Sequence, residues 1–221
     1  MALYQYKCAQ KISDTVTQIS SSSVTIETYK NDGTGEVGAG FFISPRVIVT
    51  CAHVIALTPQ NTKPDIRAII VKTKDGDRFY ASVVDFNVTL DVAILYVNIP
   101  QTKRQYFLNL GNSGTIQNGE AVLSIGSPLG YSNTVSYGII AQNDIDPNKR
   151  FFLLDLRVNP GNSGGMIFSV EKQAVIGIAA AVINAKEAVS EGISVGIGID
   201  HVKEMLKKNG IKFVYKENQY E

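Results

Sequence analysis

One serine in this chain stands where a serine could act as a nucleophile. Ser163 lies in a turn of small residues, Pro160-Gly161-Asn162-Ser163-Gly164-Gly165, between two apolar segments typical of strands. Glycines on both sides let the backbone bend sharply and aim main-chain N–H groups at the oxygen that becomes negative when a carbonyl is attacked. Most such clusters are ordinary turns, so the assignment depends on partner residues elsewhere in the chain.

A histidine and an aspartate supply those partners. His53 is one of only two histidines and follows the apolar segment Val47-Ile48-Val49, while Asp91 stands at the mouth of the apolar run 92–95. A carboxylate there is costly to bury without a hydrogen-bonded partner. A serine hydroxyl is a weak nucleophile, so an imidazole must take its proton and a carboxylate must hold the imidazole in the right tautomer. The order His53, Asp91, Ser163 therefore predicts a catalytic triad for acyl transfer.

Six segments in the expected order resemble the trypsin-fold serine proteases, and within them the HtrA/Deg branch. They resemble the first strand, the glycine-led second strand, the histidine motif, the aspartate motif, a turn of small residues and the nucleophile motif, at 24–28, 38–43, 50–54, 91–95, 124–130 and 159–165. The resemblance spans about residues 12 to 200. It implies a serine endopeptidase that forms an acyl-enzyme on Ser163 and hydrolyses it with water.

The resemblance also assigns the residues around the nucleophile. The backbone N–H groups of Gly161 and Ser163 are the expected oxyanion donors, with Asn162 holding the loop between them. The side chain before the cut bond is expected to lie against Arg157, Val158, Asn159, Ala179, Ala180 and Ala181. Small and aliphatic walls favour valine, alanine or leucine at that position of the substrate. An inward Arg157 would instead favour an acidic residue, although we expect it to face solvent or to pair with an acid such as Asp155.

Two competing patterns are weaker. Residues 161–165 also match the G-x-S-x-G motif of α/β-hydrolases, in which the serine opens a helix and the acid and histidine follow it in the chain. Here a strand-like segment follows Ser163, and the only later histidine, His201, directly follows Asp200 at the start of a helical segment. The second pattern, Gly111-Asn112-Ser113-Gly114, lacks the second glycine and the preceding proline, so Ser113 is interpreted as a turn serine.

Short β-branched segments separated by glycine, asparagine and aspartate predict an all-β fold of two antiparallel six-stranded barrels packed together, followed by a C-terminal helix. We expect residues 1–104 to form an N-terminal segment and the first barrel, residues 105–200 the second barrel, and residues 201–221 the helix and tail. Residues 74–77 and 117–120 are expected to be hairpin turns. Asp200 is expected to cap the helix and Gly210 to end it.

Composition excludes several other classes of protein. The chain has 221 residues and a net charge of +1, which gives no electrostatic footprint for nucleic acid or an anionic membrane. The two cysteines are few for an exported trypsin relative, and Cys51 is interpreted as a small buried hydrophobic residue. Two distant histidines without paired cysteines predict no metal site, and no cofactor is expected. No leader and no apolar run of about 18 residues is visible, so we expect a cytoplasmic enzyme.

The resemblance implies polypeptide substrates, including unfolded proteins, and a role in protein quality control. It also implies a homotrimer, because relatives commonly trimerise through amino-terminal segments. The chain ends at Glu221 with no segment resembling a PDZ domain, which leaves a protease domain alone or a truncated protein. The alternative to an enzyme is a binding or chaperone module that keeps the protease fold without turnover.

Overall fold

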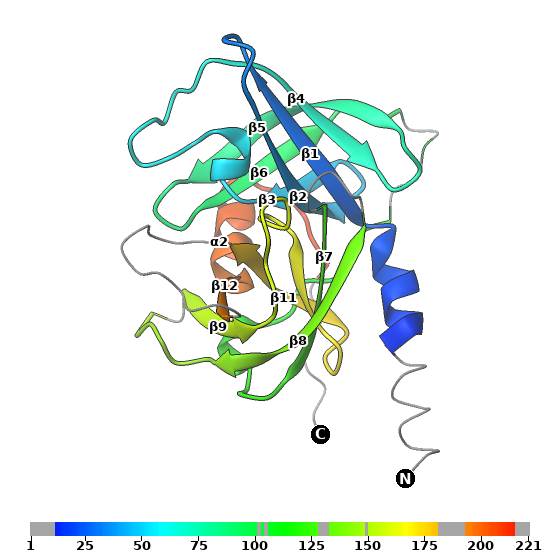
Figure 1. Cartoon of the computed structure of the whole chain (residues 1–221), viewed down its shortest axis with the longest axis vertical. Coiled ribbons are helices and arrows are strands. Elements are labelled where there is room, and N and C mark those ends of the chain that lie inside the picture. The colour runs from blue at the N-terminus through cyan, green and yellow to red at the C-terminus, as the bar shows by residue number, and fades with distance from the viewer. Residues whose placement is uncertain are drawn as a thin grey trace.

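The computed structural model describes residues 12–100, 103, 106–127, 133–148, 150–180 and 193–214. Within these residues, twelve strands form two closed antiparallel barrels of six strands each, which confirms the expected all-β fold. Figure 1 shows the first barrel above the second, with the helix of residues 12–20 running along one side. The expected C-terminal helix is also present as α2 (Ile199–Lys208), which packs on the second barrel.

The first barrel brings the histidine and aspartate motifs together through strand pairing. Its strands follow the order β1-β2-β3-β6-β5-β4 around the wall. Their bounds are β1 Ser23–Lys30, β2 Gly35–Ser44, β3 Val47–Thr50, β4 Ile66–Thr73, β5 Arg78–Asn87 and β6 Val92–Val97. Strands β3 and β6 pair antiparallel, with Thr50 opposite Ala93. The end of β3, which leads to His53, therefore lies beside the start of β6, which follows Asp91.

The second barrel carries the serine loop. Its strands follow the order β10-β11-β12-β9-β8-β7. Their bounds are β7 Ala121–Gly126, β8 Thr134–Gln142, β9 Phe151–Asp155, β10 Met166–Ser169, β11 Ala174–Ala180 and β12 Ile193–Gly198. The Phe152 ring fills the space where Gly177 and Gly196 carry no side chain. Ser163 precedes β10, which is buried along its whole length, so the serine loop is attached to a rigid strand.

An apolar cluster and direct hydrogen bonds join the two barrels. One buried cluster includes Phe41 of the first barrel and Ile125 of the second. The hydroxyls of Thr25 and Ser127 lie 2.5 Å apart across the junction. The Ala39 N–H donates to the Ser163 carbonyl at 2.8 Å, so the serine loop is fastened to the first barrel as well as to its own.

Some details differ from the expectations. Residues 74–77 form the predicted hairpin turn between β4 and β5, whereas residues 117–120 form a turn that enters β7 without joining two paired strands. Helix α2 begins at Ile199, and Asp200 does not cap it, because its carboxylate accepts hydrogen bonds from the Ser113 hydroxyl and the Gly114 N–H. Gly210 follows the helix in the left-handed region, as expected. Strand β6 ends at Val97 and β7 begins at Ala121, so the boundary at residue 104 stays a prediction.

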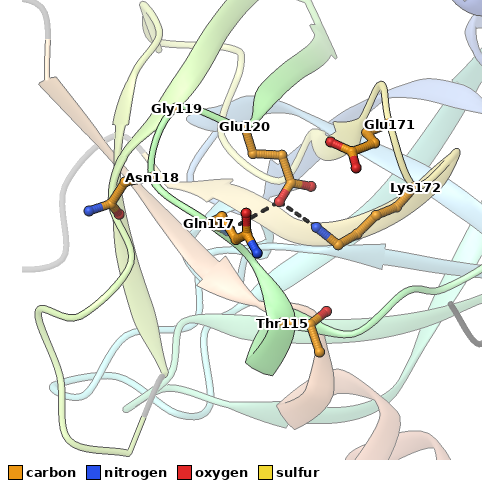
Figure 2. A pocket seen from close by; sticks show the side chains of 7 residues that line it. All are labelled: Thr115, Gln117, Asn118, Gly119, Glu120, Glu171 and Lys172. Atoms are coloured by element: carbon orange, nitrogen blue, oxygen red, sulfur yellow. Dashed lines mark hydrogen bonds and ion pairs between the residues drawn. The ribbon is translucent and has the colours of Figure 1, made fainter. Parts of the chain in front are cut away.

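A cavity of about 660 Å³ opens at one end of the second barrel, lined by Thr115, Gln117, Asn118, Gly119, Glu120, Glu171 and Lys172. Figure 2 shows Lys172 reaching across it to the Glu120 carboxylate. That carboxylate also accepts hydrogen bonds from the Ser169 hydroxyl at 2.5 Å and from the Gln117 N–H at 3.2 Å. Ser169 ends β10 whereas Ser163 precedes it, so this ion pair braces the barrel at the end of β10 opposite the serine loop.

Breaking this ion pair is expected to destabilise the fold. The Lys172 and Glu120 side chains are 8% and 3% exposed, so Lys172→Met leaves a buried carboxylate without its counter-charge. We expect the free energy of unfolding, measured by urea denaturation, to fall by about 3 kcal/mol or more. Lys208→Met is the matched control, because the Lys208 side chain is 75% exposed in its pair with Asp85 and should change stability by less than about 1 kcal/mol. Equal small losses in both variants would contradict the structural role.

Candidate active site

His53 follows β3 closely, three residues after the strand ends at Thr50. It begins the 3₁₀ turn η1 (His53–Ile55), which Ala56 closes in the left-handed region at φ 58°. The Val54 carbonyl accepts a hydrogen bond from the Thr28 hydroxyl at 2.8 Å, and the Val54 side chain packs where Gly38 has no Cβ. Strands β1 and β2 therefore hold the turn in place, and the His53 side chain is left 40% exposed.

The Asp91 carboxylate is hydrogen-bonded to both the ring and the backbone of His53. It lies 2.6 Å from His53 Nδ1 through Oδ2, and Oδ1 accepts the His53 main-chain N–H at 2.9 Å. The Asp91 carbonyl accepts the Ala52 N–H at 3.2 Å. These contacts need a left-handed backbone, with φ 57° at Asp91, which aspartate tolerates better than most residues. Nδ1–H therefore faces the carboxylate, which leaves Nε2 as the proton acceptor.

The surroundings of His53 favour its protonated form on balance. Burial of the imidazole lowers its pKa and is the largest single influence. The hydrogen bond and charge of Asp91, with a further contribution from the charge of Glu36, outweigh burial and raise the pKa of His53 above its ordinary value of 6.5. An imidazole with a raised pKa is a stronger base, which suits a group that must take a proton from a hydroxyl.

The serine loop consists of two consecutive tight turns. In the first, Asn162 N–H donates to the Asn159 carbonyl at 2.9 Å across Pro160 and Gly161, and φ 97° at Gly161 makes it a type II turn. In the second, Gly165 N–H donates to the Asn162 carbonyl at 3.0 Å across Ser163 and Gly164, with φ 86° at Gly164. The glycines of the sequence motif thus stand where positive φ is required.

Gly164 also allows the loop to reach the histidine segment. A Cβ at Gly164 would collide with the Ala39 carbonyl, the Thr50 hydroxyl and the Cys51 nitrogen. On its other side the Gly164 N–H donates to the Ala179 carbonyl at 2.9 Å. The residue after Ser163 is therefore packed against the segment that ends two residues before His53. This approach brings the serine motif to the histidine and aspartate motifs.

Two N–H groups in this loop remain available. The N–H groups of Asn162, Gly164 and Gly165 each donate to a carbonyl, whereas among the described residues those of Gly161 and Ser163 meet no acceptor. These are the two donors expected for an oxyanion hole. Asn162, between these two residues, is buried, and its Oδ1 packs against Gly126 without a hydrogen-bond partner in the described structure.

Cys51, expected to be a small buried hydrophobic residue, is also a neighbour of the site. The thiol is fully buried, as its apolar strand predicted, and it donates to the Ala179 carbonyl at 3.5 Å. Burial, and then the charge of Asp91, raise the pKa of the Cys51 thiol well above its ordinary range, so it stays protonated. The sequence placed Cys51 two residues before His53, which hinted that it lies near the site. A position on an apolar strand does not show which distant residues the side chain contacts.

Cys51, His53 and Asp91 also form a cluster whose possible ligand atoms all lie within 4.8 Å of one another. Short spacing alone does not make a metal site, because His53 Nδ1 and Asp91 Oδ2 are already hydrogen-bonded to each other at 2.6 Å. A metal ion bound there would have to displace that bond and deprotonate a fully buried thiol. The geometry is that of a hydrogen-bonded pair that leaves Nε2 for chemistry.

The structure describes all but one of the residues expected to contact the substrate side chain before the cut bond. Ala179 and Ala180 are buried on β11, and the Val158 N–H donates to the Ser194 hydroxyl at 3.2 Å. Asn159 is exposed and opens the first turn of the serine loop. Arg157 is exposed, and within the described residues it makes no ion pair with Asp155. Ala181 lies outside the described residues.

Comparisons with known proteins agree with this geometry. A family model described as a trypsin-like peptidase domain matches residues 38–178. The serine protease HTRA2, mitochondrial, of Drosophila erecta is 33% identical over 184 residues, which are 79% of this chain and 40% of that protein. A probable periplasmic serine endoprotease DegP-like of Pseudomonas putida strain F1 is 35% identical over 185 residues, 79% of this chain and 35% of that protein. This chain therefore spans less than half the length of these relatives.

A solved structure shows the same similarity in three dimensions. The HtrA-type protease AlgW with tripeptide superposes with a TM-score of 0.73 at 27% sequence identity, covering 89% of this chain and 62% of that one. None of the described helices is both long and apolar enough to cross a bilayer. The cytoplasmic location expected from the sequence finds no support in these comparisons, because the relatives are named as mitochondrial and periplasmic.

Proposed function

The chain belongs to the trypsin-like peptidase family, in its HtrA branch, and we propose that it is a serine endopeptidase whose catalytic residues are His53, Asp91 and Ser163. The observation that carries the proposal is the pair of hydrogen bonds between Asp91 and His53. The carboxylate lies 2.6 Å from His53 Nδ1 and 2.9 Å from the His53 main-chain nitrogen. A carboxylate that only stabilised the fold would not need to fix the tautomer of a partly exposed imidazole.

In the proposed mechanism, Ser163 Oγ attacks the carbonyl carbon of the peptide bond while His53 Nε2 takes its proton. The negative oxygen of the tetrahedral intermediate is stabilised by the N–H groups of Gly161 and Ser163, which are otherwise without acceptors in the described structure. The imidazolium then gives its proton to the leaving amine, and an acyl-enzyme remains. Water attacks this ester with His53 again as base, which releases the acid and restores the serine.

Polypeptides are the proposed substrates, in line with the serine proteases that this chain resembles. The buried Ala179 and Ala180 are consistent with small or aliphatic residues before the cut bond, and the exposed position of Arg157 is consistent with a side chain that faces solvent. Unfolded proteins as substrates, a role in quality control and a homotrimeric assembly remain proposals that rest on the resemblance to HtrA proteases.

A fluorophosphonate probe tests the proposed function, because it labels only a serine that an adjacent base activates. We expect wild-type protein to be labelled, Ser163→Ala to lose all labelling and His53→Ala to lose nearly all of it. Ser113→Ala is the matched control, because Ser113 lies in the same Gly-Asn-Ser-Gly sequence as Ser163 but donates its hydroxyl to Asp200 at 2.8 Å. This variant should be labelled like wild type. Absence of labelling in folded wild-type protein would instead support the silent binding module.

A further inference from the structure

Strand β2 passes beside the candidate active site on the side opposite β11. The Gly164 N–H meets the Ala179 carbonyl of β11, while the Ser163 carbonyl accepts the Ala39 N–H of β2. The serine therefore lies between these two strands. Since the residue before the cut bond is proposed to lie against Ala179 and Ala180, the part of the substrate after the cut bond must leave toward β2.

One carboxylate of β2 projects from the same face of the β1–β2 ribbon that packs against the His53 turn. Glu36 pairs with Thr28 across the β1–β2 ribbon, and residues directly opposite each other project from the same face. Thr28 uses that face to bond the Val54 carbonyl, and Gly38, two residues after Glu36, packs against the Val54 side chain. Glu36 therefore lies two residues before Gly38 on the same face of β2, next to the residues that hold the His53 turn and at the rim of the site.

Glu36 is also exposed and only lightly held. Its side chain is 48% exposed, and its partner is Lys30, 3.3 Å away and 28% exposed. Its negative charge is one of the influences that raise the pKa of His53. The Glu36 carboxylate is therefore within electrostatic reach of the imidazole. Exposed ion pairs of this kind are weak, so a substrate cation can replace Lys30.

We propose that Glu36 is a specificity-determining residue that favours lysine or arginine at the first or second position after the cut bond. The inference rests on the proposed function and adds a leaving-side preference to it. The substrate cation takes the place of Lys30 at the carboxylate, and Lys30 limits the preference by competing for the same group. Among the described residues, the charged and titratable groups that act on this arrangement are Asp91, Cys51, Glu36 and, paired to Glu36, Lys30.

Quenched fluorescent peptides with valine before the cut bond test the inference. The peptides carry lysine, glutamine or glutamate at each of the two following positions, and kcat/KM is measured for each. In Glu36→Gln we expect the ratio of lysine to glutamine peptides to fall by up to about fivefold, the upper end of what one exposed ion pair contributes. In Lys30→Gln, which frees the carboxylate, the same ratio should rise, and in Glu36→Lys the preference should turn to glutamate.

Glu27→Gln is the matched control. Glu27 lies on the same ribbon but pairs with Val37, on the opposite face, and binds Arg78 at 2.5 Å, so the lysine preference should not change. The Glu36→Gln enzyme should also show an acid limb of kcat/KM at lower pH, because a negative charge that raises the pKa of His53 has been removed. An unchanged preference in Glu36→Gln, with peptides still cleaved, would overturn this inference alone. Failure of wild-type protein to cleave peptides or to react with the probe would overturn the proposed function.

Discussion

Replacing Asp91 by asparagine is expected to lower kcat by about 10⁴-fold, with little change in the folded structure. The carboxylate accepts from His53 Nδ1 at 2.6 Å and from the His53 N–H at 2.9 Å. An asparagine keeps the shape but can donate its amide to Nδ1, which places the imidazole proton on Nε2, where the base must be free. Steady-state hydrolysis of a quenched peptide measures the loss, and urea denaturation checks the fold.

Asp85→Asn is the control for this variant. Asp85 is a carboxylate of the same barrel that is bonded to the end of α2 rather than to His53: it accepts a hydrogen bond from the Asn209 side chain at 2.6 Å and pairs with Lys208. Its replacement should leave kcat within about twofold, the small change expected of a residue that has no contact with His53. If Asp91→Asn kept wild-type kcat, Asp91 would not orient the base, and the proposed triad would be wrong.

The same contact sets the pH dependence. Only a neutral imidazole can accept the serine proton, so kcat/KM falls as the pH drops through the pKa of His53, which lies above 6.5. Burial opposes protonation, so the raised value depends on the hydrogen bond and charge of Asp91 with the charge of Glu36. In Asp91→Asn that support is lost and the pKa of His53 should fall. An NMR titration of the His53 ring in both proteins measures this shift directly.

Replacing Gly161 by alanine should reduce kcat by about 10²- to 10³-fold, the effect of losing one oxyanion donor. At φ 97° an alanine is strained by roughly 1 to 3 kcal/mol. The turn can relieve that strain by rotating the Pro160–Gly161 peptide, because a type I turn has negative φ at its third residue and also accepts proline at the second. The rotation points the residue 161 N–H away from the developing charge. Substrate binding, measured as KM, should change little.

Gly119→Ala separates strain from catalysis. Gly119 has a similar φ of 82°, in the turn that enters β7, and open space surrounds the position of an added Cβ. This variant should lose stability to a similar extent in urea denaturation but keep its kcat. A wild-type kcat in Gly161→Ala would show that the residue 161 N–H is not a donor in the transition state.

The sequence alone determined the parts of the site that depend on local backbone geometry. The glycines around Ser163 predicted positive φ and close approach, and the structure has φ 97° at Gly161 and φ 86° at Gly164. Apolar strand segments beside His53 and Asp91 predicted two strand ends, and β3 and β6 pair so that these ends meet. Such features can be predicted from sequence because glycine marks positions of positive φ and apolar segments mark buried strands.

Only the tertiary structure decided which side chains meet across strands and barrels. Asp200 looked like a helix cap, but its carboxylate bonds the distant Ser113 and Gly114. Cys51 looked like a simple core residue, yet it reaches Ala179 on the other barrel. Glu36 gave no signal, because its place at the rim follows from its register opposite Thr28 and from the docking of Val54 beneath that face. Contacts between segments far apart in the chain are set by register and packing, which local residue patterns do not encode.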